Sequence, residues 1–128
     1  MNLLLDTHTL LWMADGAPEL SALAATHIAS PMHAKYVSVA SLWEIAIKVS
    51  IRKLTLRRPL DEMIATLRAT GLVAILPIAD AHVVKVSSLP LHHRDPFDRL
   101  LVAQALADGL TVVGDDAAFD AYGVTRLW

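Results

Sequence analysis

Short apolar runs rich in β-branched residues alternate along the chain with longer segments of helical pattern. The runs predict strands at Asn2–Leu5, Tyr36–Val39, Val73–Leu76, Thr111–Val113 and Val124–Leu127. Helix start and stop signals predict helices over 59–71, 80–90 and 95–109, with Asp80 as the cap of the second. This alternation predicts an α/β fold with a mostly parallel sheet of about five strands and helices on both faces. No repeat or linker interrupts residues 1–128, so we expect one domain.

Six of the thirteen acidic residues stand where these elements meet. They are Asp6, Glu44, Asp95, Asp98, Asp115 and Asp116. Strand ends of a parallel sheet open into one crevice, which would gather these side chains. Crowded carboxylates repel one another, and the usual reason to tolerate this is a hard divalent cation such as Mg²⁺ or Mn²⁺. The pattern therefore indicates a metal-dependent enzyme acting on phosphate esters.

Each acid also has an ordinary structural interpretation. Asp6 suits the N-cap of a following helix, and its position at a strand end favours a site role. Asp95 before Pro96 is good helix-start chemistry, which leaves it a mixed role. Asp98 precedes a buried run and is favoured as a site residue.

Glu44 has two possible helix contexts. Ser41 and Glu44 form a capping-box pattern, whereas a cap at Ser38 would leave Glu44 in the second turn. Asp115 and Asp116 have ordinary turn composition, although a strand end in this sheet type favours at least one facing the crevice.

Basic, histidine and aromatic residues give weaker signals. The densest basic stretch contains Lys48, Arg52, Lys53, Arg57 and Arg58, for which a solvated helix end is the default and a phosphate-binding groove the alternative. Arg94 and Arg99 can pair with the nearby acids or with substrate phosphate. His92 and His93 are candidate metal ligands, but adjacent histidines point in different directions. Trp12, Trp43 and Trp128 have apolar neighbours, which favours core packing over base stacking.

Composition narrows the setting. The chain is 55% hydrophobic, with a mean hydropathy of +0.47, so we expect an exposed apolar patch used for self-association or for a partner. A net charge of −2 argues against nucleic-acid binding by overall charge and leaves room for a local basic patch. The absence of cysteine fits a reducing cytoplasm, and no signal peptide or membrane-spanning run is expected.

Four ordered segments resemble the PIN-domain ribonucleases of the VapC type, the toxin half of a prokaryotic toxin–antitoxin pair. They are Leu4–Trp12, Ser38–Lys48, His93–Ala105 and Asp116–Trp128. The resemblance implies a PIN-like three-layer α/β/α fold and a metal-dependent endoribonuclease that uses Mg²⁺ or Mn²⁺ to activate water against an RNA phosphodiester. It also implies a homodimer and a cognate antitoxin.

Carried over by position, the resemblance makes Asp6, Glu44 and Asp98 the core metal-binding acids. Asp116 becomes the fourth, with Asp95 and Asp115 auxiliary. Arg94, Arg99, Lys48 and Arg52 are the expected substrate contacts. The family usually has Thr or Ser two residues before the fourth acid, where this chain has Gly114.

Gly114 supports a rival interpretation, a catalytically weak PIN-fold module for RNA binding or assembly. A small-molecule phosphatase is disfavoured, because Asp6-Thr7-His8 lacks the second Asp of an aspartyl-phosphate motif. A DNA nuclease stays open, since nothing in the sequence reads a 2′-hydroxyl.

Overall fold

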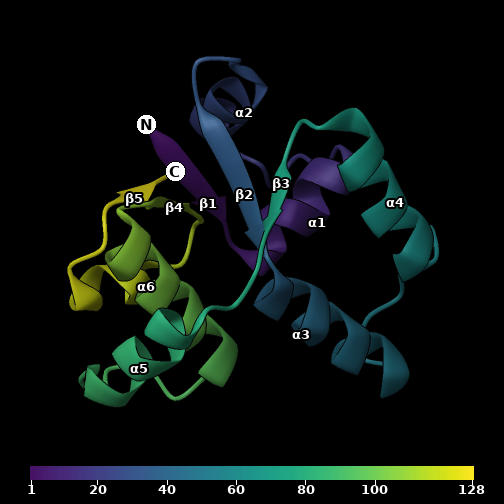
Figure 1. Ribbon diagram of the computed structural model, residues 1–128. Coiled ribbons are helices and arrows are strands. Elements are labelled where there is room, and N and C mark those ends of the chain that lie inside the picture. Colours follow the sequence, from purple (N-terminus) through teal and green to yellow (C-terminus); the bar gives the residue numbers. More distant parts are fainter.

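The central feature of the fold is a parallel five-stranded sheet (Figure 1). The computed structural model describes residues 1–128. The strands are β1 (Asn2–Leu5), β2 (Ala34–Ser38), β3 (Ala74–Leu76), β4 (Thr111–Val113) and β5 (Arg126–Leu127). Their order is β3-β2-β1-β4-β5, and every pairing is parallel. The expected strands are confirmed, although Val39 begins a helix and Val124 precedes β5.

Helices fill the connections between strands. They are α1 (Thr7–Asp15), α2 (Ala22–Ala29), α3 (Val39–Ser50), α4 (Leu60–Thr70), α5 (Asp80–Ser88), α6 (Pro96–Asp108) and the 3₁₀ turn η1 (Ala117–Tyr122). The three helices expected from start and stop signals are confirmed. The prediction that Asp80 caps the second of these helices was wrong, because Ala79 is the N-cap and Asp80 is the first helical residue. Helix α2, capped by Ser21, was not expected.

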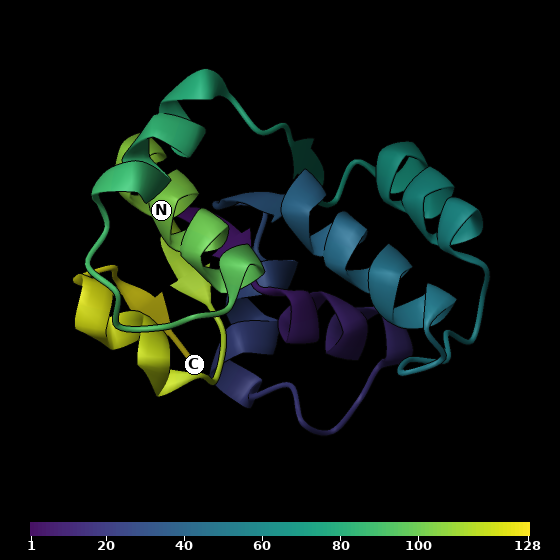
Figure 2. The same cartoon turned by 90° about the horizontal axis from the view of Figure 1, so that it is seen from below.

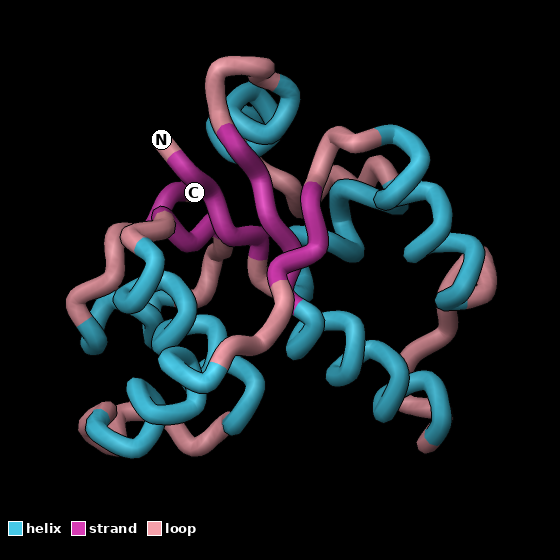
Figure 3. The backbone as a smooth tube through the Cα atoms, in the orientation of Figure 1, coloured by secondary structure: helices cyan, strands magenta, loops and turns pink.

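The two faces of the sheet bury separate apolar clusters, as the alternation of side chains along a strand requires. Leu3 and Leu5 of β1 pack with α1, α2, α3 and α4 on one face. Leu4 packs with α6 and η1 on the other. Figure 3 shows the strands running between these two groups of helices, and Figure 2 shows them from below. The three-layer α/β/α prediction is confirmed.

The chain reverses its direction across the sheet at β1. Successive connections run from β1 outward to β2 and β3, and later return to β4 on the other side. Leu5 at the end of β1 pairs with Val37 and with Val113. Ligands bind at such a switch point, outside the carboxyl ends of the strands. Asp6 therefore enters the crevice at its centre.

The tryptophans do not all lie in the core. Trp43 is 57% exposed and meets Phe97 edge to face, so the prediction of core packing was wrong for this residue. Trp12 and Trp128 are half-buried and pack against each other with ring centroids 5.5 Å apart. No helix in the structure combines the length and the apolar character needed to cross a membrane.

Candidate active site

Asp6 is both a helix cap and a buried carboxylate of the crevice. Its Oδ1 accepts a hydrogen bond from the Thr9 amide at 2.8 Å, which caps α1. The residue is 4% exposed. Burial raises its pKa, the bonds from Thr9 and the charge of His8 lower it, and Asp115 raises it further. The structural and functional interpretations of Asp6 are therefore compatible.

Glu44 is buried in the second turn of α3. Ser38 caps this helix by accepting from the Ala40 amide, so the capping box from Ser41 does not form. Thr7 donates its hydroxyl to Glu44 Oε1 at 2.7 Å, and Lys48 donates to Oε2 at 2.8 Å. Both carboxylate oxygens thus have partners, which a buried carboxylate requires. The bond to Glu44 is the main cause that raises the pKa of Lys48.

Asp98 lies at the start of α6 beside Asp95. Asp95 caps the helix, because its Oδ1 accepts from the amides of Phe97 and Asp98 at 2.8 and 3.1 Å. Burial raises the pKa of Asp98 from 3.8 to about 6, and Asp95 is the next cause. The negative charges of Glu44 and Asp6 also raise this pKa, whereas the charge of His93 lowers it. The charges of Asp6, just past the end of β1, and of Glu44 on α3 therefore reach Asp98 at the start of α6.

His93 and Asp116 complete the group around Asp98. One ligand atom from each of the three side chains lies within 4.8 Å of the others. The Asp95 amide donates to His93 Nδ1 at 2.9 Å, so neutral His93 carries its proton on Nε2. That nitrogen lies 3.4 Å from Asp98 Oδ2. A proton-bearing nitrogen therefore faces the acid.

Asp115 and Asp116 are exposed and differ in their neighbours. Asp116 caps η1 by accepting from the Ala118 amide at 2.9 Å, and it faces His93 and Asp98. The Asp115 side chain makes no hydrogen bond within the protein, and its negative charge raises the pKa of Asp6. The turn interpretation is correct for Asp116, and both acids lie beside the crevice.

The donor set of this crevice fits a hard divalent cation. Asp6, Glu44, Asp98 and Asp116 supply carboxylate oxygens, which Mg²⁺ and Mn²⁺ prefer, and the chain has no thiolate to compete. Burial that raises the pKa of Asp6 and Asp98 is a cost in free energy, and a bound cation would offset it.

The predicted substrate-contacting cations occupy different places. Lys48 reaches the crevice through Glu44 and also feels the charges of Asp95 and Asp98. Arg94 is exposed in the segment before α6. Arg52 lies two residues beyond the end of α3, whose last residue, Ser50, is about 9 Å along the helix from Glu44 at 1.5 Å per residue.

Arg99, an expected substrate contact, uses its guanidinium in bonds within the protein. Its guanidinium donates to the Pro90 carbonyl at 2.9 Å and to the Tyr122 hydroxyl at 3.1 Å. It also lies 3.4 Å from the carbonyls of Val86 and Leu89 at the end of α5. These contacts tie α5 to α6 and occupy the guanidinium of Arg99.

Sequence reasoning missed several supporting residues. Thr7 buries a hydroxyl between Glu44 and Ser41, and it stood unnoticed directly after Asp6. His93 was set aside because its neighbour is also histidine, although its spacing from the cap residue Asp95 was a usable signal. Arg126 donates to the Gly114 carbonyl at 3.1 Å, and no local pattern marked it.

The chain belongs to the PIN domain family. The match to that family covers residues 3–124, which is nearly the whole sequence. Comparison with curated protein sequences gives no match.

Solved structures of similar fold include a member of the VapBC family of toxin–antitoxin systems. A chain in the crystal structure of VapBC2 from Rickettsia felis bound to a DNA fragment from their promoter has a TM-score of 0.73, 14% identity, and coverage of 99% of this chain and 98% of that one. FitAcB from Neisseria gonorrhoeae has a TM-score of 0.69 and 18% identity, and the match covers 98% of this chain and 96% of that one. VapBC-5 from Mycobacterium tuberculosis has a TM-score of 0.60 and 20% identity, and the match covers 98% of each chain. At these identities the likeness concerns the fold.

The raised pKa of Asp98 predicts a pH dependence of stability. Between pH 3.8 and about 6 the folded metal-free protein holds more protons at Asp98 than the unfolded chain, so its stability falls as pH rises through that window. Asp98→Asn removes this titration. Urea unfolding should show the free energy of the variant rising relative to wild type by about 2 kcal/mol from pH 4 to 7. A difference that stays constant with pH would contradict the assignment.

The contacts of Arg99 predict a structural role. Arg99→Ala should lower the free energy of unfolding by about 1–3 kcal/mol, because several backbone carbonyls lose a charged donor. Arg94→Ala, an exposed arginine in the preceding segment, is the matched control and should change it by less than about 0.5 kcal/mol. Equal effects in urea unfolding would show that Arg99 does not hold α5 against α6.

Proposed function

We propose that this chain is a metal-dependent endoribonuclease and the toxin component of a toxin–antitoxin pair. The observation that carries the proposal is the position of Asp98, which offers a ligand atom within 4.8 Å of one from Asp116 and whose pKa is raised in part by the charges of Glu44 and Asp6. Membership of the PIN domain family supports a nuclease, and the similar structures from toxin–antitoxin complexes support the biological setting.

The residues of the crevice have distinct roles in this proposal. Asp6, Glu44 and Asp98 would hold Mg²⁺ or Mn²⁺, with Asp116 as the fourth acid and Asp95 and Asp115 beside them. A divalent cation bound there would neutralise phosphate charge and lower the pKa of an attacking water. Thr7 keeps the Glu44 carboxylate fixed through its 2.7 Å hydrogen bond. His93 presents its Nε2 proton beside Asp98, where it can exchange protons with groups in the crevice.

Cations around the crevice would bind the RNA backbone. Lys48 already lies among the acids, and with a cation on Glu44 its Nζ would be available to a phosphate oxygen. Arg94 flanks the start of α6, and Arg52 lies farther along α3. Together they supply local positive charge that the net charge of −2 conceals.

The test is cleavage of a mixed cellular RNA pool by purified protein in Mg²⁺, Mn²⁺ or EDTA. Wild type should cleave only with metal, and Asp98→Asn should lower the rate by at least about 100-fold, because a ligand carboxylate is lost. Asp80→Asn is the matched control, an exposed acid at the start of another helix, and should cleave as wild type does.

Other outcomes of this assay identify the rivals. Cleavage by both Asp98→Asn and wild type would contradict the assignment of the site. RNA binding without cleavage, in folded protein freed of partner, would favour the assembly module. Parallel assays with DNA and with small phosphate esters distinguish a DNA nuclease and a phosphatase from a ribonuclease.

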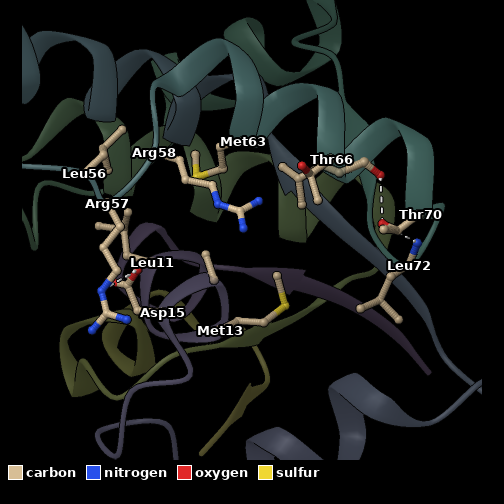
Figure 4. Close-up of a pocket in the computed structure, with 12 residues that line it drawn as sticks. Leu11, Met13, Asp15, Leu56, Arg57, Arg58, Met63, Thr66, Thr70 and Leu72 are labelled. Carbon is tan, nitrogen blue, oxygen red and sulfur yellow. Dashed lines mark hydrogen bonds and ion pairs between the residues drawn. The ribbon is translucent and has the colours of Figure 1, made fainter.

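An apolar hollow between α1 and α4 suits the proposed antitoxin. Its volume is about 450 Å³. Figure 4 shows Met13 of α1 on one side and Met63 and Arg58 on the other. Arg57 lies at its edge, 3.8 Å from Asp15. An apolar segment with acidic residues fits both the lining and the charged edge.

We also propose a homodimer, for which exposed apolar side chains such as Trp43 provide contact surface.

Blocking the hollow should weaken the antitoxin complex. Ala14 is exposed on α1 and lines the hollow, so Ala14→Arg places a long cation where an apolar partner segment would lie. Its affinity for the product of the neighbouring gene, measured by calorimetry, should fall by about 10-fold or more. Ala65→Arg, exposed on α4 and outside the lining, is the matched control. Both variants should still cleave RNA, and equal affinities would place the partner elsewhere.

A further inference from the structure

Asp6 and Gly114 are cross-strand neighbours just past the ends of β1 and β4. The parallel register pairs Leu5 with Val113, so the next pair along is Asp6 and Gly114. Paired residues of neighbouring strands direct their side chains to the same face of a sheet. A side chain at position 114 would therefore point toward the carboxylate of Asp6.

The Asp6 side chain fills the space that a residue other than glycine would need at position 114. A Cβ built on Gly114 would lie 2.8 Å from Asp6 Cγ and 3.4 Å from its Cβ, with Oδ2 closer still. Contacts below 3.0 Å are essentially never made by real Cβ atoms. Two atoms of the carboxyl group collide, so a small rotation of one oxygen does not relieve the overlap.

The backbone on both sides is held in place. The Gly114 amide donates to the Leu127 carbonyl at 3.2 Å, and its own carbonyl accepts from Arg126 Nη1 at 3.1 Å. The Asp6 carboxylate is fixed by the Thr9 amide at 2.8 Å. The easiest relief of the collision is a turn of the Asp6 side chain, which breaks its bond to Thr9 and moves the carboxylate.

We propose that Gly114 is a positioning residue, whose missing side chain reserves the space in which the Asp6 carboxylate is set for metal binding. The inference rests on the proposed function. It reverses the expectation that Gly114 marks weakened activity. In this chain a hydroxyl at position 114, as the family resemblance leads one to expect, would displace a metal-binding acid.

The experiment compares Gly114→Ala and Gly114→Ser with wild type and with Ala117→Ser. Ala117→Ser is the control, because it adds a hydroxyl at an exposed position three residues farther along, at the start of η1. Mn²⁺ affinity is measured by calorimetry, RNA cleavage by initial rate, and the Thr9 amide by NMR of the metal-free protein. Both Gly114 variants should bind Mn²⁺ about 10- to 100-fold more weakly and cleave more slowly. Their Thr9 amide should shift and exchange faster with solvent.

The opposite results would overturn the inference. Gly114→Ser that binds Mn²⁺ and cleaves RNA as well as wild type shows that position 114 tolerates a side chain. An unmoved Thr9 amide shows that Asp6 was not displaced. If Gly114→Ser fails to fold, it is combined with Asp6→Ala, which removes the carboxylate. Recovery of folding supports the inference, and continued failure contradicts it.

Failure of the proposed function gives a different result. Wild type would then neither bind Mn²⁺ nor cleave RNA, whereas the Thr9 amide would still shift in Gly114→Ala if Asp6 fills that space. If wild type and the Gly114 variants bind Mn²⁺ and cleave RNA equally well, the proposed function is supported and only the role of Gly114 is contradicted.

Discussion

Burial of like-charged carboxylates at the end of β1 and the start of α6 is the constraint on which this structure depends. Asp6 and Asp98 lose much of their contact with water, and burial raises the pKa of both. The neighbouring elements partly compensate this cost. Thr9 donates its amide N–H to Asp6, His93 lowers the pKa of Asp98 and so favours its charged form, and Lys48 pairs with Glu44. A divalent cation is the remaining compensation that the donor set fits, which links the electrostatics of the fold to its proposed chemistry.

Much of this arrangement is readable from the sequence because it depends on local signals. The apolar runs at strands and the glycines after helices follow from elementary propensity, and they fix the order of elements. The carboxyl ends of parallel strands lie at one edge of the sheet, so the sequence alone predicts that Asp6 and Asp116 lie near each other. The caps at Asp6 and Asp95 are equally local, since each accepts from amides two or three residues later.

Other features depend on tertiary contacts that no short pattern encodes. Trp43 has apolar neighbours in sequence, yet α3 turns it outward against Phe97. Arg99 resembled a phosphate ligand, but the carbonyls at the end of α5 lie within its reach. The meaning of Gly114 emerges only from the β1–β4 register, which brings Asp6 against it. Composition and spacing identify the acids, whereas packing decides which neighbours position them.

If these carboxylates form one divalent-cation site, anomalous diffraction from crystals soaked in Mn²⁺ will locate the ion among them. We expect an anomalous peak within coordination distance of carboxylate oxygens of Asp6 and Asp98, with Glu44 and Asp116 around it. A well-ordered crystal that shows no peak there, at a Mn²⁺ concentration that supports RNA cleavage, would contradict it. A peak held by other residues would do the same.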